Sequence, residues 1–156
     1  MPLKAGDKAP DFKLFSSDKA EVSLSDYQGK NLVILFFPAA FTGVCTKELC
    51  GIRDTMSMYN SLNTDIVAIS VDAVYTLGKF KEDQGFNFPL LSDFNKDAIS
   101  AFDCKYDVWN FNMMGVAKRS AFVVDKDGII RYAEVLENAG DLPNFDAVND
   151  VLNKLN

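Results

Sequence analysis

Cys45 is the residue of this 156-residue sequence whose type and position most favour chemistry. It follows an apolar run, residues 31–37, after a short turn, and falls in the first turn of the helix expected next. Unpaired backbone N–H groups and the helix dipole stabilise an anion there, which favours the reactive thiolate. The alternative is a small core residue, because most buried cysteines are inert. Helix position alone leaves both interpretations open.

The sequence contains no histidine. This excludes Ser-His-Asp triads, Cys-His pairs, haem ligation by histidine and every zinc site that uses histidine. A cysteine nucleophile in this chain must therefore be activated by a helix terminus, an arginine, a lysine or a hydrogen bond.

Composition narrows the class of protein further. The length and the 48% apolar, 24% charged composition predict one globular domain, residues 1–156. A net charge of −6 with only three arginines argues against a nucleic-acid partner. No apolar run has the length of a signal-peptide core or a membrane span, so we expect a cytoplasmic protein without a membrane partner. An odd, low number of cysteines (Cys45, Cys50 and Cys104) predicts thiols rather than a disulfide framework.

Strand and helix patterns alternate along the chain and predict an α/β fold with parallel βαβ units. Thr42 is the expected N-cap of the helix that carries Cys45. Residues 103–118 have no clear period and are expected to form a long loop that carries function or an interface. The expected elements are a hairpin of residues 12–15 and 21–24, strands at 32–37, 65–71 and 89–93, helices at 42–62, 74–84 and 96–102, a hairpin of residues 120–124 and 129–133, and a final helix at 144–155.

The segment Pro38-x-x-x-Thr42-x-x-Cys45 resembles the active-site signature of the peroxiredoxins. Further segments resemble this family in the expected order along nearly the whole chain, namely residues 36–37, 46–48, 69–72, 90–93 and 118–125. The resemblance implies a thioredoxin-like fold with a central mixed sheet, flanking helices and an N-terminal β-hairpin extension. It also implies thiol-dependent reduction of hydrogen peroxide or alkyl hydroperoxides without a cofactor. A thioredoxin- or glutaredoxin-like reductant and a homodimer follow from the same resemblance.

The resemblance assigns a role to each residue of the signature. Cys45 is the peroxidatic cysteine, whose thiolate attacks the peroxide and becomes a sulfenic acid. Thr42 hydrogen-bonds thiolate and peroxide, and Arg119 places a fixed cation against both. The backbone N–H groups of Val44 and Cys45 are further donors to the substrate. Pro38 packs over the thiolate and excludes water.

Glu48 lies three residues after Cys45 and is therefore its neighbour on the helix surface. A bare carboxylate there would oppose thiolate formation, so we expect Glu48 to pair with an arginine, Arg119, and orient it. The alternatives are a solvated glutamate and an arginine in an ordinary surface salt bridge.

The spacing of Cys45 and Cys50 resembles the Q-type, or bacterioferritin-comigratory, peroxiredoxins, in which the second cysteine resolves the sulfenic acid. The later half of the chain resembles the AhpE-type branch, whose members often use one cysteine. In an intact helix the two Cα atoms are roughly 8–9 Å apart, beyond the ~7 Å that a disulfide spans. Resolution by Cys50 therefore requires the helix start to unwind, and an incidental thiol is the alternative. Cys104 is expected to be a packed, inert thiol.

Two possible metal sites and two other functions compete with this interpretation. Residues 93–104 begin like a calcium loop but have Ala98 at the sixth position and Cys104 at the twelfth, and the cysteines lack zinc spacing. We therefore expect no metal. The competing functions are a thiol–disulfide oxidoreductase that uses Cys45 and Cys50, and a non-catalytic thioredoxin-like interaction module. Thr42 and Arg119 argue against the oxidoreductase, because disulfide exchange needs neither.

Overall fold

The centre of the fold is β3 (Asn31–Phe36), in which all six residues are buried. The structure, a computed structural model, describes residues 2–156. β3 pairs in parallel with β4 (Thr64–Ser70) and antiparallel with β8 (Ser120–Val124), so the sheet is mixed. The seven strands have the order β2-β1-β5-β4-β3-β8-β9. The other four are β1 (Lys13–Ser16), β2 (Glu21–Ser23), β5 (Leu90–Ser92) and β9 (Ile130–Val135).

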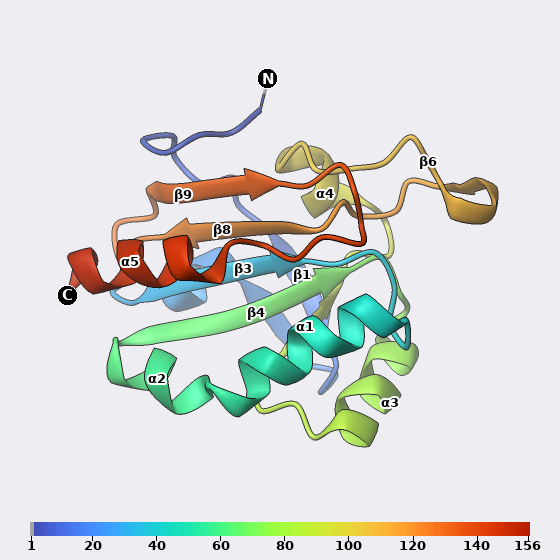
Figure 1. Cartoon of the computed structure of the whole chain (residues 1–156), viewed down its shortest axis with the longest axis horizontal. Helices are drawn as coiled ribbons and strands as arrows, with labels where there is room; N and C mark the ends of the chain where they lie inside the picture. Colours follow the sequence, from blue (N-terminus) through green and yellow to red (C-terminus); the bar gives the residue numbers. More distant parts are fainter. Residues whose placement is uncertain (1) are drawn as a thin grey trace.

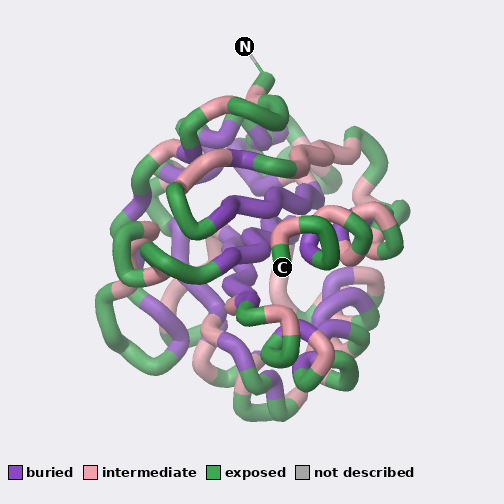
Figure 2. Tube along the Cα trace, turned by 90° about the vertical axis from the view of Figure 1, so that its left-hand side faces the viewer, coloured by how far each residue is buried: buried purple, intermediate pink, exposed green. Residues whose placement is uncertain are grey.

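Helices cover both faces of this sheet, as predicted for a strand with no exposed face (Figure 1). One face packs against α1, α2, α3 and α5, and the other against α4 and the N-terminal segment. Figure 2 shows buried stretches of the chain in the interior, with exposed stretches around the outside. The helices are α1 (Gly43–Asp54), α2 (Met56–Ser61), α3 (Val74–Gln84), α4 (Asp97–Ala101) and α5 (Phe145–Leu155), with 3-10 helices η1 (Leu24–Tyr27) and η2 (Asn110–Asn112).

Most predicted elements are confirmed. β1 and β2 form the predicted N-terminal hairpin, which joins the sheet through the antiparallel pair Phe15 and Ser92. α3 ends where predicted, because Gly85 adopts the left-handed conformation that closes a helix. The single helix predicted for residues 42–62 is wrong, since α1 and α2 are separated at Thr55. The Thr55 hydroxyl donates to the Gly51 carbonyl at 2.9 Å, a local bond of the kind that competes with the helical backbone pattern.

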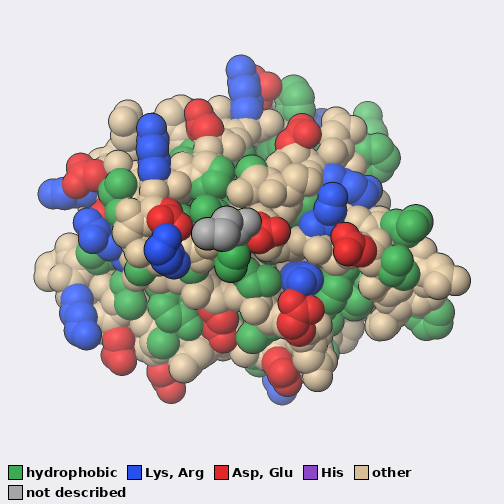
Figure 3. Space-filling view, turned by 90° about the horizontal axis from the view of Figure 1, so that it is seen from above, with side chains coloured by type: hydrophobic (Ala, Val, Ile, Leu, Met, Phe, Trp, Pro, Cys, Tyr) green, Lys and Arg blue, Asp and Glu red, His purple; other side chains and the backbone are tan. Residues whose placement is uncertain are grey.

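The predicted loop at residues 103–118 contains a small hairpin of its own, which we call the arm. Its strands are β6 (Val108–Trp109) and β7 (Met113–Met114), and η2 forms its tip. The arm extends away from the sheet at one end of the molecule (Figure 1). Figure 3 shows several hydrophobic side chains at that end, and on the rest of the same face hydrophobic side chains lie among charges of both signs. The arm itself exposes Val108, Phe111, Met113 and Met114 and is thus an apolar extension of the fold.

Within residues 2–156, every helix is too short or too polar to cross a membrane.

Candidate active site

The turn between β3 and α1 is held in place by the neighbouring strand. Asp72, two residues after the end of β4, accepts a hydrogen bond from the Ala40 backbone N–H at 2.8 Å. The Thr42 hydroxyl donates to the Ala39 carbonyl at 2.7 Å, so Thr42 occupies the N-cap position of α1 without capping it through its side chain. Phe41 has a φ of 65°, which non-glycine residues rarely adopt, and its ring lies 4.9 Å from that of Phe80. These contacts place the first turn of α1 at the end of β3.

Cys45 is buried in this first turn, with 1% of its surface exposed. It faces the sheet together with Leu49 and Ile52, as the helical spacing predicted. Arg119, the residue before β8, is equally buried and donates from Nη2 to the Cys45 sulfur at 3.2 Å. A guanidinium stays protonated in proteins, so a fixed positive charge lies against this thiol.

Glu48 lies on the other side of the same guanidinium. Its Oε1 accepts a hydrogen bond from Arg119 Nη1 at 2.7 Å, and neither side chain is more than 1% exposed. Burial raises the pKa of Glu48 to about 7, although Arg119 acts in the opposite direction. Glu48 Oε2 is buried without a hydrogen-bond partner in the described part of the chain. The Glu48 carboxyl is therefore oriented toward Arg119 and can change its protonation state near neutral pH.

A cavity of about 370 Å³ opens beside Cys45. Thr42 and Arg119 contribute to its lining together with Cys45, and the arm contributes mostly apolar side chains. Pro38 is buried next to this region but is not among the lining residues. The side chains that give the cavity its shape include Thr42, Val44, Cys45, Trp109, Phe111 and Met113.

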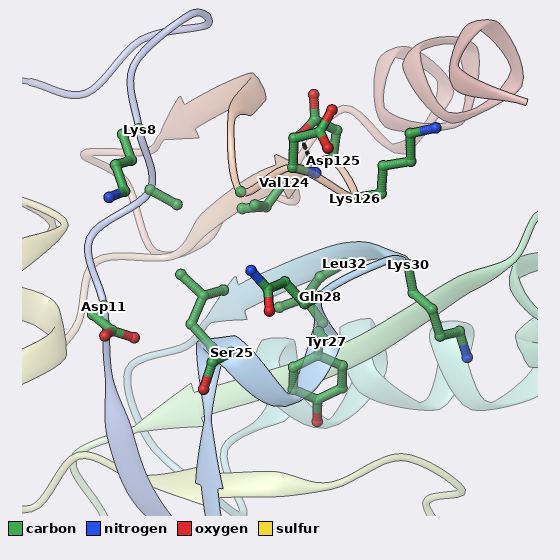
Figure 4. A pocket seen from close by; sticks show the side chains of 14 residues that line it. Lys8, Asp11, Ser25, Tyr27, Gln28, Lys30, Leu32, Val124, Asp125 and Lys126 are labelled. Atoms are coloured by element: carbon green, nitrogen blue, oxygen red, sulfur yellow. Dashed lines mark hydrogen bonds between the residues drawn. The ribbon is translucent and has the colours of Figure 1, made fainter.

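A second cavity, of about 410 Å³, lies at the opposite end of the sheet (Figure 4). It is bounded by residues 8–11, η1, the start of β3 and the turn after β8. Gln28, Leu32 and Val124 surround it, with Asp11 on the N-terminal segment. All three cysteines are absent from its lining, so this cavity is not the site of thiol chemistry.

The other two cysteines lie apart from this arrangement. All three cysteines are free thiols. Cys50 is half-buried on α1, and its sulfur donates to the Gln84 side chain at 3.5 Å, so it faces α3 rather than Cys45. Cys104 is buried in the core on the opposite face of the sheet. Among residues 2–156 no group of three acidic, cysteine or histidine side chains is placed to hold a metal ion.

Three of the predicted residues, Cys45, Glu48 and Arg119, are thus in direct contact, although Arg119 is more than seventy positions away in sequence. Two contributors were missed by sequence reasoning. The first is Asp72, whose position directly after a parallel strand was a usable signal. The second is the backbone carbonyl of Ala139, which accepts two hydrogen bonds from Arg119 and which no side-chain pattern could reveal. The arrangement can stabilise a thiolate and the negative charge that leaves an oxygen it attacks.

Comparison with known proteins identifies the class to which this site belongs. The AhpC/TSA family matches residues 5–133, and the chain is a member of that family. Alkyl hydroperoxide reductase E from Mycobacterium bovis is 42% identical over 135 residues, which is 85% of this chain and 86% of the relative. Peroxiredoxin Bcp from Escherichia coli is 38% identical over 136 residues, covering 84% and 85%. The chain is therefore a peroxiredoxin, a thiol-dependent peroxidase, as its signature predicted.

Solved structures agree on the fold. The crystal structure of peroxidoxin BcpB from Mycobacterium tuberculosis superposes with a TM-score of 0.87 at 30% identity, and the match covers 99% of both chains. A cysteine-to-serine mutant of PrxQ from Xylella fastidiosa superposes with a TM-score of 0.84 at 26% identity, covering 99% of this chain and 96% of that one. The predicted thioredoxin-like α/β fold is confirmed.

Proposed function

We propose that Cys45 is the peroxidatic residue of this peroxidase and that Arg119 activates it. The observation that carries the proposal is the Arg119 guanidinium at 3.2 Å from a buried thiol in the first turn of a helix. Glu48 orients the guanidinium through its 2.7 Å bond. Residues 1–156 act as a single catalytic domain.

The reaction begins when the Cys45 thiolate attacks one oxygen of the peroxide. A sulfur–oxygen bond forms, the oxygen–oxygen bond breaks, and its electron pair leaves on the distal oxygen as an alkoxide or hydroxide, which takes up a proton. Arg119 and the backbone N–H groups of Val44 and Cys45 stabilise this developing charge. The Thr42 hydroxyl, already donating to Ala39, accepts a hydrogen bond from the peroxide. Pro38 limits the access of water to the sulfur.

The resulting sulfenic acid is reduced by Cys50 or by an external thiol. Reduction by Cys50 forms an intramolecular disulfide and releases water. Because α1 is continuous from residue 43 to 54 and Cys50 points toward Gln84, this route requires the start of α1 to unwind. The external route needs no such change, and a thioredoxin- or glutaredoxin-like protein is the proposed reductant for either route.

Organic hydroperoxides are proposed substrates alongside hydrogen peroxide. The apolar wall that Trp109, Phe111 and Met113 contribute is larger than hydrogen peroxide needs and can take up an alkyl or aryl group. Comparing hydrogen peroxide with cumene hydroperoxide tests this proposal. A Phe111→Ala variant should lose rate with cumene hydroperoxide and retain it with hydrogen peroxide.

We assign a homodimer and a cytoplasmic location on chemical grounds. The arm exposes Phe111 at 94%, Met114 at 71% and Val108 at 53%, a group of apolar side chains that a second copy of the chain would cover. A cytoplasmic location supplies the reducing conditions that keep three free cysteines as thiols. Sedimentation of the wild-type protein and of Phe111→Asp tests the dimer.

The central test mixes reduced protein with hydrogen peroxide in a stopped-flow instrument and analyses the products by mass spectrometry. We expect rapid oxidation that begins at Cys45. Slow oxidation, or oxidation that begins at another cysteine, would refute the proposal. A loss of two hydrogens joining Cys45 to Cys50 identifies the intramolecular route, whereas sulfenic acid that persists identifies the external one. Cys50→Ser is the matched variant, because it removes only the intramolecular route.

A further inference from the structure

Arg119 has an acceptor that belongs to neither α1 nor the sheet. Its Nε and Nη2 both donate to the carbonyl oxygen of Ala139, at 3.2 and 2.9 Å. Ala139 lies in residues 136–144, a mostly exposed segment without regular secondary structure between β9 and α5, which we call the strap. A buried side chain of the reaction site is thus held in part by the backbone of a surface segment. Such segments are the more easily displaced parts of a fold, so whatever fixes the strap also fixes Arg119.

The strap is fixed close to Ala139 by Tyr106. The Tyr106 hydroxyl donates to the Glu137 carbonyl at 2.7 Å, and only 9% of Tyr106 is exposed. The backbone of Tyr106 is itself held, because its N–H donates to Val116 and its carbonyl accepts from Gly115. Tyr106 is therefore a rigid support for the strap.

A second contact to Glu137 contributes less. Lys118 Nζ lies 2.6 Å from Glu137 Oε1, but the glutamate side chain is 79% exposed. Ion pairs in water contribute little, since solvent screens them and ordering two long side chains has an entropic cost. At this end the strap is thus held by the Tyr106 hydroxyl and by the Leu136 backbone N–H, which donates to the Arg119 carbonyl at 2.9 Å. Of these two anchors, the hydroxyl is the one that a side-chain substitution can remove.

We propose that Tyr106 is a positioning residue for the peroxidase reaction. By holding the Glu137 carbonyl it keeps the Ala139 carbonyl against Arg119, and so keeps the guanidinium directed at Cys45. The Tyr106 ring also stacks with Trp109 of the arm, with ring centroids 6.1 Å apart and an interplanar angle of 17°. Tyr106 therefore connects the apolar wall of the cavity to the cation of the site.

Loss of the Tyr106 hydroxyl should loosen the position of the Arg119 guanidinium without unfolding the protein. Water can replace the hydroxyl at the Glu137 carbonyl because the strap lies at the surface. The tether is nevertheless lost, and Ala139 can move away from the guanidinium. Stabilisation of developing charge depends on donors that are held in place before the reaction, so small displacements of Arg119 reduce the rate.

The experiment measures Cys45 oxidation by hydrogen peroxide in Tyr106→Phe. We expect the second-order rate constant to fall about tenfold, a typical sensitivity of rate to misplaced donors. The rate of alkylation by iodoacetamide should fall much less, because iodide leaves without charge building up on an oxygen beside Arg119. Equal losses in the two reactions would indicate general damage to the site and would overturn the proposal, as would an unchanged peroxide rate.

A double-mutant cycle tests whether Tyr106 affects the oxidation rate of Cys45 by positioning Arg119. In an Arg119→Lys background the change Tyr106→Phe should add little further loss, because lysine cannot make the paired bonds to Ala139. An undiminished loss in that background would contradict the proposal. Tyr27→Phe, at the opposite end of the sheet, is the control for removing a tyrosine hydroxyl and should leave the rate unchanged (Figure 4).

A second variant loosens the strap from its exposed side. Asn138 Oδ1 accepts a hydrogen bond from the Gly140 N–H at 2.8 Å, so Asn138→Ala should produce a smaller loss with the same contrast between peroxide and iodoacetamide. The proposal rests on the function proposed above, and the two can fail separately. A wild-type protein that is not rapidly oxidised refutes the function, whereas a rapid wild type with unaffected Tyr106→Phe and Asn138→Ala refutes only the positioning role.

Discussion

Cys45 and Cys104 are both buried free thiols, yet their surroundings differ in one decisive respect. They lie on opposite faces of the sheet, in the two hydrophobic cores. Two consecutive residues contact these two thiols, because neighbouring side chains along a strand point to opposite faces of the sheet. Arg119 contacts Cys45 on one face, and Ser120 contacts Cys104 on the other. One thiol thus faces a cation and the other a neutral hydroxyl.

Cys45 and Cys104 are equally buried but have different partners. Burial raises the pKa of Cys104 to about 12, and the bond to Ser120 opposes this only in part. Cys104 therefore stays a thiol at neutral pH and behaves as a small apolar residue. Cys45 is buried to the same extent but lies at a helix start against a guanidinium. Under the proposed function, the partner of a buried cysteine, rather than its depth, distinguishes the nucleophile Cys45 from the inert Cys104.

The largest expected effect is that of removing the sulfur of Cys45, the proposed nucleophile. Cys45→Ser should abolish peroxide consumption in the presence of dithiothreitol, since a serine hydroxyl is not ionised at neutral pH. Cys104→Ser is the matched variant on the other face and should keep most of the activity of the folded protein. Substantial turnover by Cys45→Ser would break the comparison.

Replacing the guanidinium of Arg119 should have the next largest effect. Arg119→Lys keeps the charge but loses the fork of donors that reaches Cys45, Glu48 and Ala139 together. We expect the rate constant for peroxide to fall about 100-fold, the scale typical of losing an aligned donor. Stopped-flow measurement of Cys45 oxidation checks this. A rate within about threefold of wild type would show that charge alone suffices.

The protonation of Glu48 should appear in the pH dependence of stability. Its folded pKa, about 7, lies above the value of about 4.5 expected in the unfolded chain. The stabilisation is therefore complete below about 4.5 and is lost as the pH rises through about 7. Relative to Glu48→Gln, which cannot ionise, the wild-type free energy of unfolding should decline over this range by about 1–3 kcal/mol. Urea unfolding at several pH values measures it, and parallel pH profiles would contradict the assignment.

The smallest effect is expected from Cys104→Ala. The substitution leaves a small cavity in the core that also holds Phe102 and Phe122 and should lower the free energy of unfolding by about 1 kcal/mol. The rate of Cys45 oxidation should not change. A clear change in that rate would show that the two faces of the sheet are coupled, contrary to the comparison.

Much of the fold and part of the site could be predicted from local patterns. The fully apolar β3, the helix closed by Gly85 and the amphipathic α5 are determined by neighbouring residues, and each was predicted. The break at Thr55 was missed, because a hydroxyl that bonds to its own helix looks the same in sequence as one that does not. The arm was missed because its strands are only two residues long.

The side chains of the candidate site could be predicted from the sequence, but its backbone contributor could not. The signature indicated Thr42 and Cys45, helical spacing indicated Glu48, and resemblance added Arg119, all of which lie at one end of the sheet. The Ala139 carbonyl was not predictable, because every residue has one and only the path of the strap selects this one. The orientation of Cys50 toward Gln84 likewise depends on how α1 packs against α3.

The pairing of β8 with its neighbours determines which face of the sheet Arg119 reaches. Five residue pairs join β8 to β3, and β9 pairs along its other edge. A shift of one position would carry Arg119 to the face of Cys104, so this alignment must be kept. The arm just before it forms no part of the large sheet, so its length is not tied to this register. Under the proposed function, substitutions in the arm would change the apolar part of the cavity while Arg119 stays on the face of Cys45.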